Sequence, residues 1–109
     1  MSTKRLLATV LALATVAGAA TAHPPEDSVR PSFSHALPNV PGKSLVAVEV
    51  SYPPGGASAP HRHARSAFIY AYVLSGQIES QVDDGPARIY KTGESFHEEP
   101  GAHHRVSRN

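Results

Sequence analysis

Alternating apolar and polar residues predict a series of short strands through most of the chain. In Leu45–Tyr52 the valines at alternate positions fall on one face, because successive strand residues point to opposite sides. Further strands are expected at 67–74, 77–82, 87–90, 95–98 and 104–107, each bounded by Gly, Pro, Asp or Ser turns. No segment after residue 22 has a helical period, so the pattern predicts an all-β antiparallel sandwich or small barrel.

The first 22 residues form a different kind of segment. Lys4 and Arg5 precede an uncharged run rich in Leu and Ala, and Ala20-Thr21-Ala22 matches a small-x-small cleavage site. This pattern predicts a signal peptide over 1–22, cleavage after Ala22, and a periplasmic or secreted product without stable membrane insertion. A membrane anchor is the alternative, but the apolar run is shorter than the ~20 residues that a span needs.

Residues 23–43 are expected to form a Pro-rich N-terminal leader, and residues 44–109 the folded domain. The leader holds five of the ten prolines and has room for one edge strand around Val29–Phe33.

The composition excludes several function classes. Without Cys there is no disulfide, thiolate metal site or cysteine nucleophile. Ten basic against nine acidic residues leave no surplus of positive charge of the kind that binds nucleic acid. Seven His in 109 residues direct attention to metal binding.

The segment His61-Arg62-His63 carries the clearest chemical meaning. On a strand, residues i and i+2 face the same side, so both imidazoles can reach one metal ion. Two solvated loop histidines are the alternative for this pair taken alone. A second segment, 93–104, ends in a Pro-Gly turn and His104, which an antiparallel barrel can bring beside the pair. Three neutral imidazoles with open coordination positions suit Fe, Mn, Ni, Cu or Zn.

Glycines at fixed spacing accompany these histidines. The first group is Gly55, five residues, His61-x-His63, then Gly76; the second is Gly93, five residues, Glu99-Pro100-Gly101, two residues, then His104. In this order the two groups resemble the motifs of the cupin superfamily, over roughly 45–109. The resemblance implies a jelly-roll barrel holding a divalent metal through three histidines. It implies either metal-dependent oxygenation or isomerisation of a small organic molecule, or a non-catalytic binding or sensor domain.

Two departures from the family's pattern matter. The glutamate that follows the His-x-His pair in the family is missing, because the matching window holds Ala67, Phe68 and Ile69. Glu98, just before the Pro-Gly turn, is a candidate carboxylate ligand or catalytic acid/base, with surface charge as the alternative. The chain also stops at Asn109, before the family's closing strands, which predicts a C-terminally short barrel, one completed by a second subunit, or a truncated fragment.

The strand expected at 67–74 divides its side chains between two faces. The face shared with the histidine pair is expected to form the apolar wall of a ligand pocket and consists of Ala67, Ile69, Ala71 and Val73. The opposite face, exposed in a monomer, consists of Phe68, Tyr70, Tyr72 and Leu74. This exposed face predicts a homodimer, unless a bulge reverses the parity and buries the aromatic residues. His103 is expected to point away from the site, and His97 to be partly buried.

Overall fold

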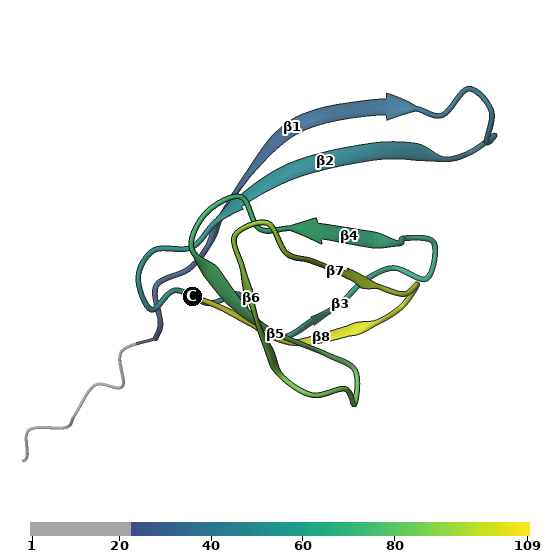
Figure 1. The fold of residues 1–109 in the computed structure, drawn as a ribbon. Helices are drawn as coiled ribbons and strands as arrows, with labels where there is room; N and C mark the ends of the chain where they lie inside the picture. The colour runs from purple at the N-terminus through teal and green to yellow at the C-terminus, as the bar shows by residue number, and fades with distance from the viewer. Residues whose placement is uncertain (1–22) are drawn as a thin grey trace, which may run out of the picture.

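The computed structural model describes residues 23–109, so the predicted signal peptide at 1–22 lies outside the described residues. In this part the fold is all β, as the alternation of residues predicted (Figure 1). The strands are β1 (Ser28–Ala36), β2 (Ser44–Ser51), β3 (His61–Arg62), β4 (Ile69–Tyr72), β5 (Gln77–Val82), β6 (Arg88–Lys91), β7 (Ser95–Glu98) and β8 (His103–Arg108). No helix that could cross a membrane occurs in residues 23–109.

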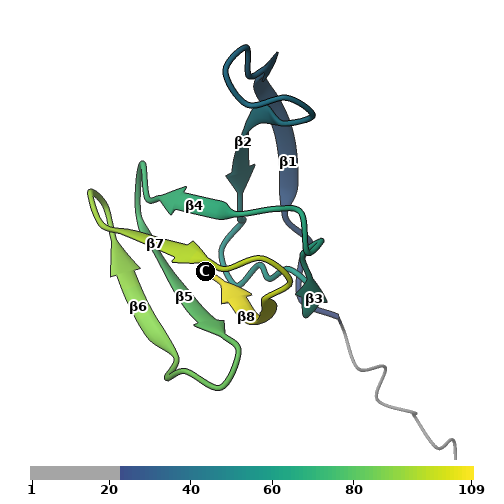
Figure 2. The same cartoon turned by 90° about the vertical axis from the view of Figure 1, so that its right-hand side faces the viewer.

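The strands pair antiparallel in three sheets. The largest has the order β3-β8-β5-β6, and the two smaller sheets are β1-β2 and β4-β7. The β4-β7 sheet packs on the largest sheet through Phe96, whose ring centroid lies 4.8 Å from that of Tyr90 and 6.0 Å from that of His104. The strands described do not close into a barrel, and the arrangement is an open form of the expected jelly roll (Figure 2).

Strands β1 and β2 form a hairpin that projects from the rest of the fold (Figures 1 and 2). Their register runs from the pair Ser28–Ser51 to the pair Ala36–Ser44. The register shifts between Pro31 and Phe33, which fits a residue that has no N–H to donate to the ladder. The strand expected around Val29–Phe33 is therefore confirmed, and it is longer than expected because β2 pairs with it along its whole length.

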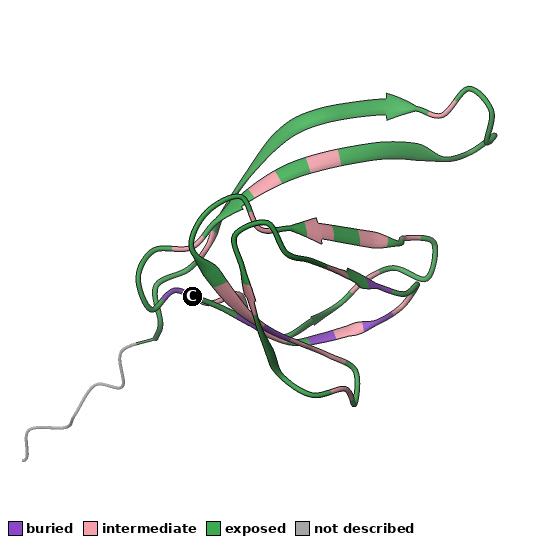
Figure 3. Ribbon diagram, in the orientation of Figure 1, coloured by how far each residue is buried: buried purple, intermediate pink, exposed green. Residues whose placement is uncertain are grey.

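The interior of the described fold is small and polar (Figure 3). Ala102 is the one hydrophobic residue buried in residues 23–109. The buried polar and charged residues are Ser80, Glu98, His104 and Ser107. The most enclosed part of the protein is thus the region around His104, where the sequence predicts a metal ligand.

A β-bulge in β8 turns two side chains inward. Gln81 pairs with Val106 and Val82 pairs with His104, so Arg105 is the extra residue and is exposed. Because the bulge reverses the alternation of faces, His104 and Ser107 are both buried although they are three positions apart.

Candidate metal centre

The structure brings together the three histidines that the sequence singled out. His61 on β3 is the register partner of His104 on β8, and His63 follows β3 directly. One potential ligand atom from each ring lies within 4.8 Å of the others. The ring centroids of His61 and His63 are 4.8 Å apart, and those of His61 and His104 are 5.3 Å apart. Three imidazoles at these separations can reach one cation.

The turn before β8 holds the two histidine segments together. The backbone N–H of His63 donates to the carbonyl of Ala102 at 3.1 Å, and that of Gly101 donates to Ala64 at 3.3 Å. Gly101 has a φ of +75°, a conformation that disfavours side chains, and a Cβ there would lie 3.2 Å from Arg65 Cγ. Gly101, the second glycine of the second motif, is therefore required where the two segments cross.

Hydrogen bonds orient two of the imidazole rings. His61 Nδ1 lies 2.8 Å from the carbonyl oxygen of Ala59, which can only accept, so Nδ1 carries the proton and Nε2 is left free. His104 Nε2 lies 2.8 Å from Ser80 Oγ, and both residues are buried. Partners of this kind fix the tautomer and ring orientation of metal-binding histidines.

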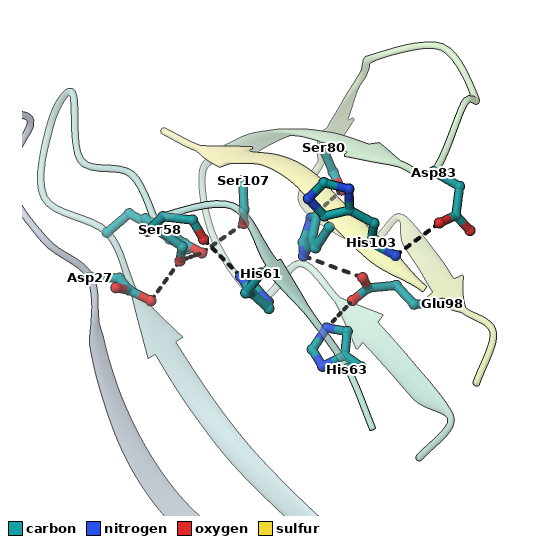
Figure 4. Close-up of polar contacts among 12 residues, drawn as sticks. Asp27, Ser58, His61, His63, Ser80, Asp83, Glu98, His103 and Ser107 are labelled. Atoms are coloured by element: carbon teal, nitrogen blue, oxygen red, sulfur yellow. Dashed lines mark hydrogen bonds and ion pairs between the residues drawn. The ribbon is translucent and has the colours of Figure 1, made fainter. Parts of the chain in front are cut away.

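Glu98 is a fourth member of the cluster, and the alternative that it is a surface charge is wrong. The residue is 2% exposed. Its Oε2 lies 3.1 Å from His63 Nε2, and its Oε1 lies 3.4 Å from His104 Nδ1 (Figure 4). The sequence did contain a signal for this placement: with a period of two, Glu98 shares a strand face with the apolar Phe96.

Two further histidines lie outside the cluster. The ligand atoms that converge do not include His103, as expected, and its backbone N–H donates to Asp83 Oδ1 at 2.8 Å. The expectation that His97 is partly buried is wrong, because its side chain is 60% exposed. His97 alternates with Glu98 along β7, so it faces outward, where it stacks on Phe68 and contacts Glu99 at 3.3 Å.

The charge state of His104 favours metal binding. Burial lowers the pKa of His104 below its ordinary value of about 6.5. The carboxylate of Glu98 opposes this effect, whereas charge on His61 or His63 lowers the pKa further. The neutral imidazole, which is the form that coordinates metals, is therefore the stable form of His104 near neutral pH.

Two buried atoms at the centre of the cluster lack hydrogen bonds. His63 Nε2 and Glu98 Oε1 are both enclosed, and neither makes a hydrogen bond with any group in the described residues. The contacts that these atoms make, from His63 Nε2 to Glu98 Oε2 and from Glu98 Oε1 to His104 Nδ1, do not have hydrogen-bond geometry. Buried polar atoms are normally paired, because an unpaired one costs about 1–3 kcal/mol. A divalent cation between the imidazoles and the carboxylate would satisfy both atoms, so the residues present fit a metal.

A cleft of about 670 Å³ opens beside the cluster. Its lining includes His61, His63, Glu98 and His104 and the apolar side chains of Val48, Val50, Ile69, Ala71, Val73 and Phe96. Ile69, Ala71 and Val73 line the cleft as predicted, whereas Ala67 does not. Tyr70, Tyr72 and Leu74 are exposed, as expected for a monomer, but they also border the cleft, so the two faces are less separate than predicted. A site with this composition can hold a small, mostly apolar molecule next to the imidazoles.

A chain of hydroxyl groups also lines the cleft, and sequence reasoning missed it. Ser58 Oγ donates to Asp27 Oδ2 at 2.7 Å, and Tyr52 OH lies 2.6 Å from Ser58 Oγ and 2.7 Å from Ser107 Oγ. The four residues come from four separate segments, so no local pattern could have connected them. Ser107 reaches this chain because of the bulge in β8.

Comparison with known protein families supports the resemblance seen in the motifs. A family model described as "Cupin domain" matches residues 48–109, which is more than half of the chain. Comparisons with curated proteins and with solved structures gave no match. The matched region contains the three clustered histidines, Glu98 and six of the eight strands in full. On this match, and with an antiparallel all-β fold, the chain belongs to the cupin family.

Proposed function

We propose that the protein binds one divalent transition metal through His61, His63 and His104 and holds a small organic molecule against it. One observation carries the proposal: three imidazoles with ligand atoms within 4.8 Å of one another lie in the wall of a cleft of about 670 Å³. The nitrogen donors suit Fe, Mn, Ni, Cu or Zn. Glu98 beside them is a carboxylate able to take part as a ligand or as an acid/base.

The residues of the cleft determine what the protein does with such a molecule. A bound metal with open coordination positions would supply Lewis-acid polarisation or dioxygen activation. The apolar side chains of Ile69, Ala71 and Phe96 would exclude water and orient the ligand, and Ser107 would bind its polar end. We therefore propose oxygenation or isomerisation of a small organic molecule. Binding or sensing without turnover is the second candidate, favoured because Ala67, Phe68 and Ile69 stand where the family's motif carries a glutamate ligand.

Elemental analysis of the purified protein tests the metal site. We expect about one equivalent of a transition metal in the wild-type protein and none in the double variant His61→Ala/His63→Ala. The matched control is His35→Ala/His97→Ala, which removes two exposed histidines outside the cluster. Equal metal content in both double variants, or a folded wild-type protein that takes up no metal, would overturn the proposal.

A turnover assay separates the two candidates. The metal-loaded protein is incubated with a panel of diketones, phenols and sugars, beside the variant His104→Ala. Turnover that disappears in the variant supports an enzyme, whereas saturable binding with an unchanged ligand supports a binding or sensor protein. A wild-type protein that neither binds nor converts any member of the panel contradicts both roles for these compound classes.

We also propose that the protein is exported. Lys4 and Arg5, the apolar run that follows them and the Ala20-Thr21-Ala22 site support cleavage after Ala22. Amino-terminal sequencing of the protein from separated periplasmic, extracellular and cytoplasmic fractions tests this. We expect a mature chain beginning at His23 outside the cytoplasm, and an uncleaved cytoplasmic chain would contradict the proposal.

A further inference from the structure

The pairing of β4 with β7 places a carboxylate where the first histidine motif lacks one. The window after His63 that should carry a glutamate holds Ala67, Phe68 and Ile69. Ile69 on β4 is the register partner of Glu98 on β7. Opposite residues of an antiparallel pair have Cβ atoms about 4.5–5.5 Å apart, so a side chain from either position can reach the same point.

We infer that Glu98 supplies the carboxylate ligand of the metal centre, from β7 rather than β4. This inference rests on the proposed metal site. Glu98 is 2% exposed and approaches His63 Nε2 at 3.1 Å and His104 Nδ1 at 3.4 Å. A carboxylate enclosed in this way is unfavourable unless a positive charge compensates it. Within the described residues, the titratable groups that contact this carboxylate are the imidazoles of His63 and His104.

The unpaired atoms indicate where the compensating charge belongs. His63 Nε2, which lies 3.1 Å from Glu98 Oε2, and Glu98 Oε1, which lies 3.4 Å from His104 Nδ1, are buried without hydrogen bonds. The contact between His63 Nε2 and Glu98 Oε2 lacks hydrogen-bond geometry, so it leaves Nε2 unsatisfied. A cation coordinated by both residues satisfies both atoms and leaves the imidazole neutral.

The substitution Glu98→Gln tests the inference, with Glu99→Gln as the matched control. Both variants remove one negative charge from adjacent positions, but Glu99 is 70% exposed and Glu98 is 2% exposed. Affinity is measured by titration of Co²⁺ against a competing chelator, and the visible absorption of bound Co²⁺ reports its coordination. We expect Glu98→Gln to lose more than about 10-fold in affinity and to change the Co²⁺ spectrum. Glu99→Gln should match the wild-type protein in both measurements.

The outcomes separate this inference from the proposed function. A wild-type protein that binds no Co²⁺ overturns the metal site itself. A wild-type protein that binds Co²⁺ while Glu98→Gln binds it with the same affinity and spectrum overturns the role of Glu98 alone. The variant Glu98→Asp serves as the test if Glu98→Gln does not fold. It keeps the negative charge but shortens the side chain by one methylene group, so we expect it to change the Co²⁺ affinity and spectrum. Unchanged Co²⁺ affinity and spectrum in that variant would also overturn the inference.

The exposed apolar surface carries a second, independent inference. The hairpin β1–β2 exposes six large apolar side chains, which are Val29, Phe33, Leu45, Val46, Val48 and Val50. The face of β4 and its flanks expose four more, which are Phe68, Tyr70, Tyr72 and Leu74. Side chains from both groups line the same cleft, so the two surfaces adjoin. Soluble monomers rarely expose contiguous apolar surface much beyond about 300–600 Å².

The geometry points to a second copy of this chain as the occupant of that surface, with its hairpin lying along β4. The three aromatic side chains on β4 and its flank are 54–66% exposed, and Leu74 beside them is 69% exposed. A stable interface buries about 800 Å² on each partner, and aromatic side chains are enriched at its centre. β4 pairs only with β7 among the described strands, so its other edge can receive a strand.

Sedimentation equilibrium of the full chain tests the interface. We expect a dimer at micromolar concentration that Tyr70→Glu converts to a monomer, because Tyr70 is 66% exposed and its replacement disturbs no core. Ile89→Glu, at a residue 58% exposed on β6, is the control and should remain dimeric. A wild-type monomer at all concentrations, or a dimer that Tyr70→Glu and Val46→Glu leave intact, would overturn the inference.

Discussion

Replacement of Ser80 by alanine tests how the site orients its most buried imidazole. Ser80 is 3% exposed, and its Oγ lies 2.8 Å from His104 Nε2. Without the hydroxyl, that ring nitrogen loses the hydrogen bond that it makes with Ser80 Oγ. An unsatisfied buried polar group of this kind lowers the free energy of unfolding by about 1–3 kcal/mol. The ring is also free to turn, so we expect metal affinity to fall about 10- to 100-fold.

Two measurements on Ser80→Ala separate these effects. Urea denaturation of the metal-free protein reports the free energy of unfolding, and titration against a competing chelator reports the metal affinity. Ser34→Ala is the control, because Ser34 lies on the exposed strand β1, away from the histidines. We expect the control to match the wild-type protein within about 0.5 kcal/mol, as is usual for surface substitutions.

A specific result would refute this reasoning. If Ser80→Ala unfolds at the same urea concentration as Ser34→Ala and binds metal as tightly, Ser80 does not hold the His104 ring. If stability falls but affinity does not, the hydroxyl supports the fold and the metal orients the ring by itself.

Three further predictions follow from the same structure. Folding lowers the pKa of His104, so the unfolded chain binds a proton at this residue more readily than the folded protein does. The metal-free protein should therefore lose stability as pH falls below about 6.5. Denaturation midpoints that are independent of pH between 5 and 8 would contradict this. Tyr52→Phe removes the hydroxyl between Ser58 and Ser107 and should destabilise the protein by about 1–3 kcal/mol while elemental analysis finds the metal content unchanged. Gly101→Ala places a Cβ at a φ of +75° and should cost about 1–2 kcal/mol, seen as a thermal midpoint about 4–16 °C lower.

The local pattern of the sequence was sufficient to predict most strands. The strand at 95–98 occurs where it was expected, and β5 and β2 match to within a residue at each end. Alternation works here because each strand has one face toward the interior and one toward solvent. The pair His61 and His63 was predictable from local spacing, whereas His104 was placed beside it by the resemblance of the two glycine–histidine groups to the cupin motifs.

Other features depend on contacts between distant segments and could not be read locally. The register that sets Glu98 opposite Ile69 follows from how β7 and β4 align, and no single segment specifies that alignment. The bulge at Arg105 reverses which residues of β8 face inward, and nothing in the sequence around it marks an extra residue. The Pro-rich region was expected to be mostly a leader, yet β2 supplies the partner that makes it a strand.

The pairing of His61 with His104 has a consequence for how the chain reaches its folded state. These two residues enclose a loop of roughly 40 residues, which contains β4, β5, β6 and β7. A metal ion held by both would act as a cross-link and reduce the entropy of the unfolded chain, by about 4 kcal/mol if it behaves as a disulfide closing the same loop. The chain has no cysteine, and its described interior buries one apolar residue. The stabilisation from such a cross-link would therefore be comparable to the whole free energy of unfolding of a small domain. Metal supply at the time of folding would then control how much of the protein folds, before any question of its activity arises.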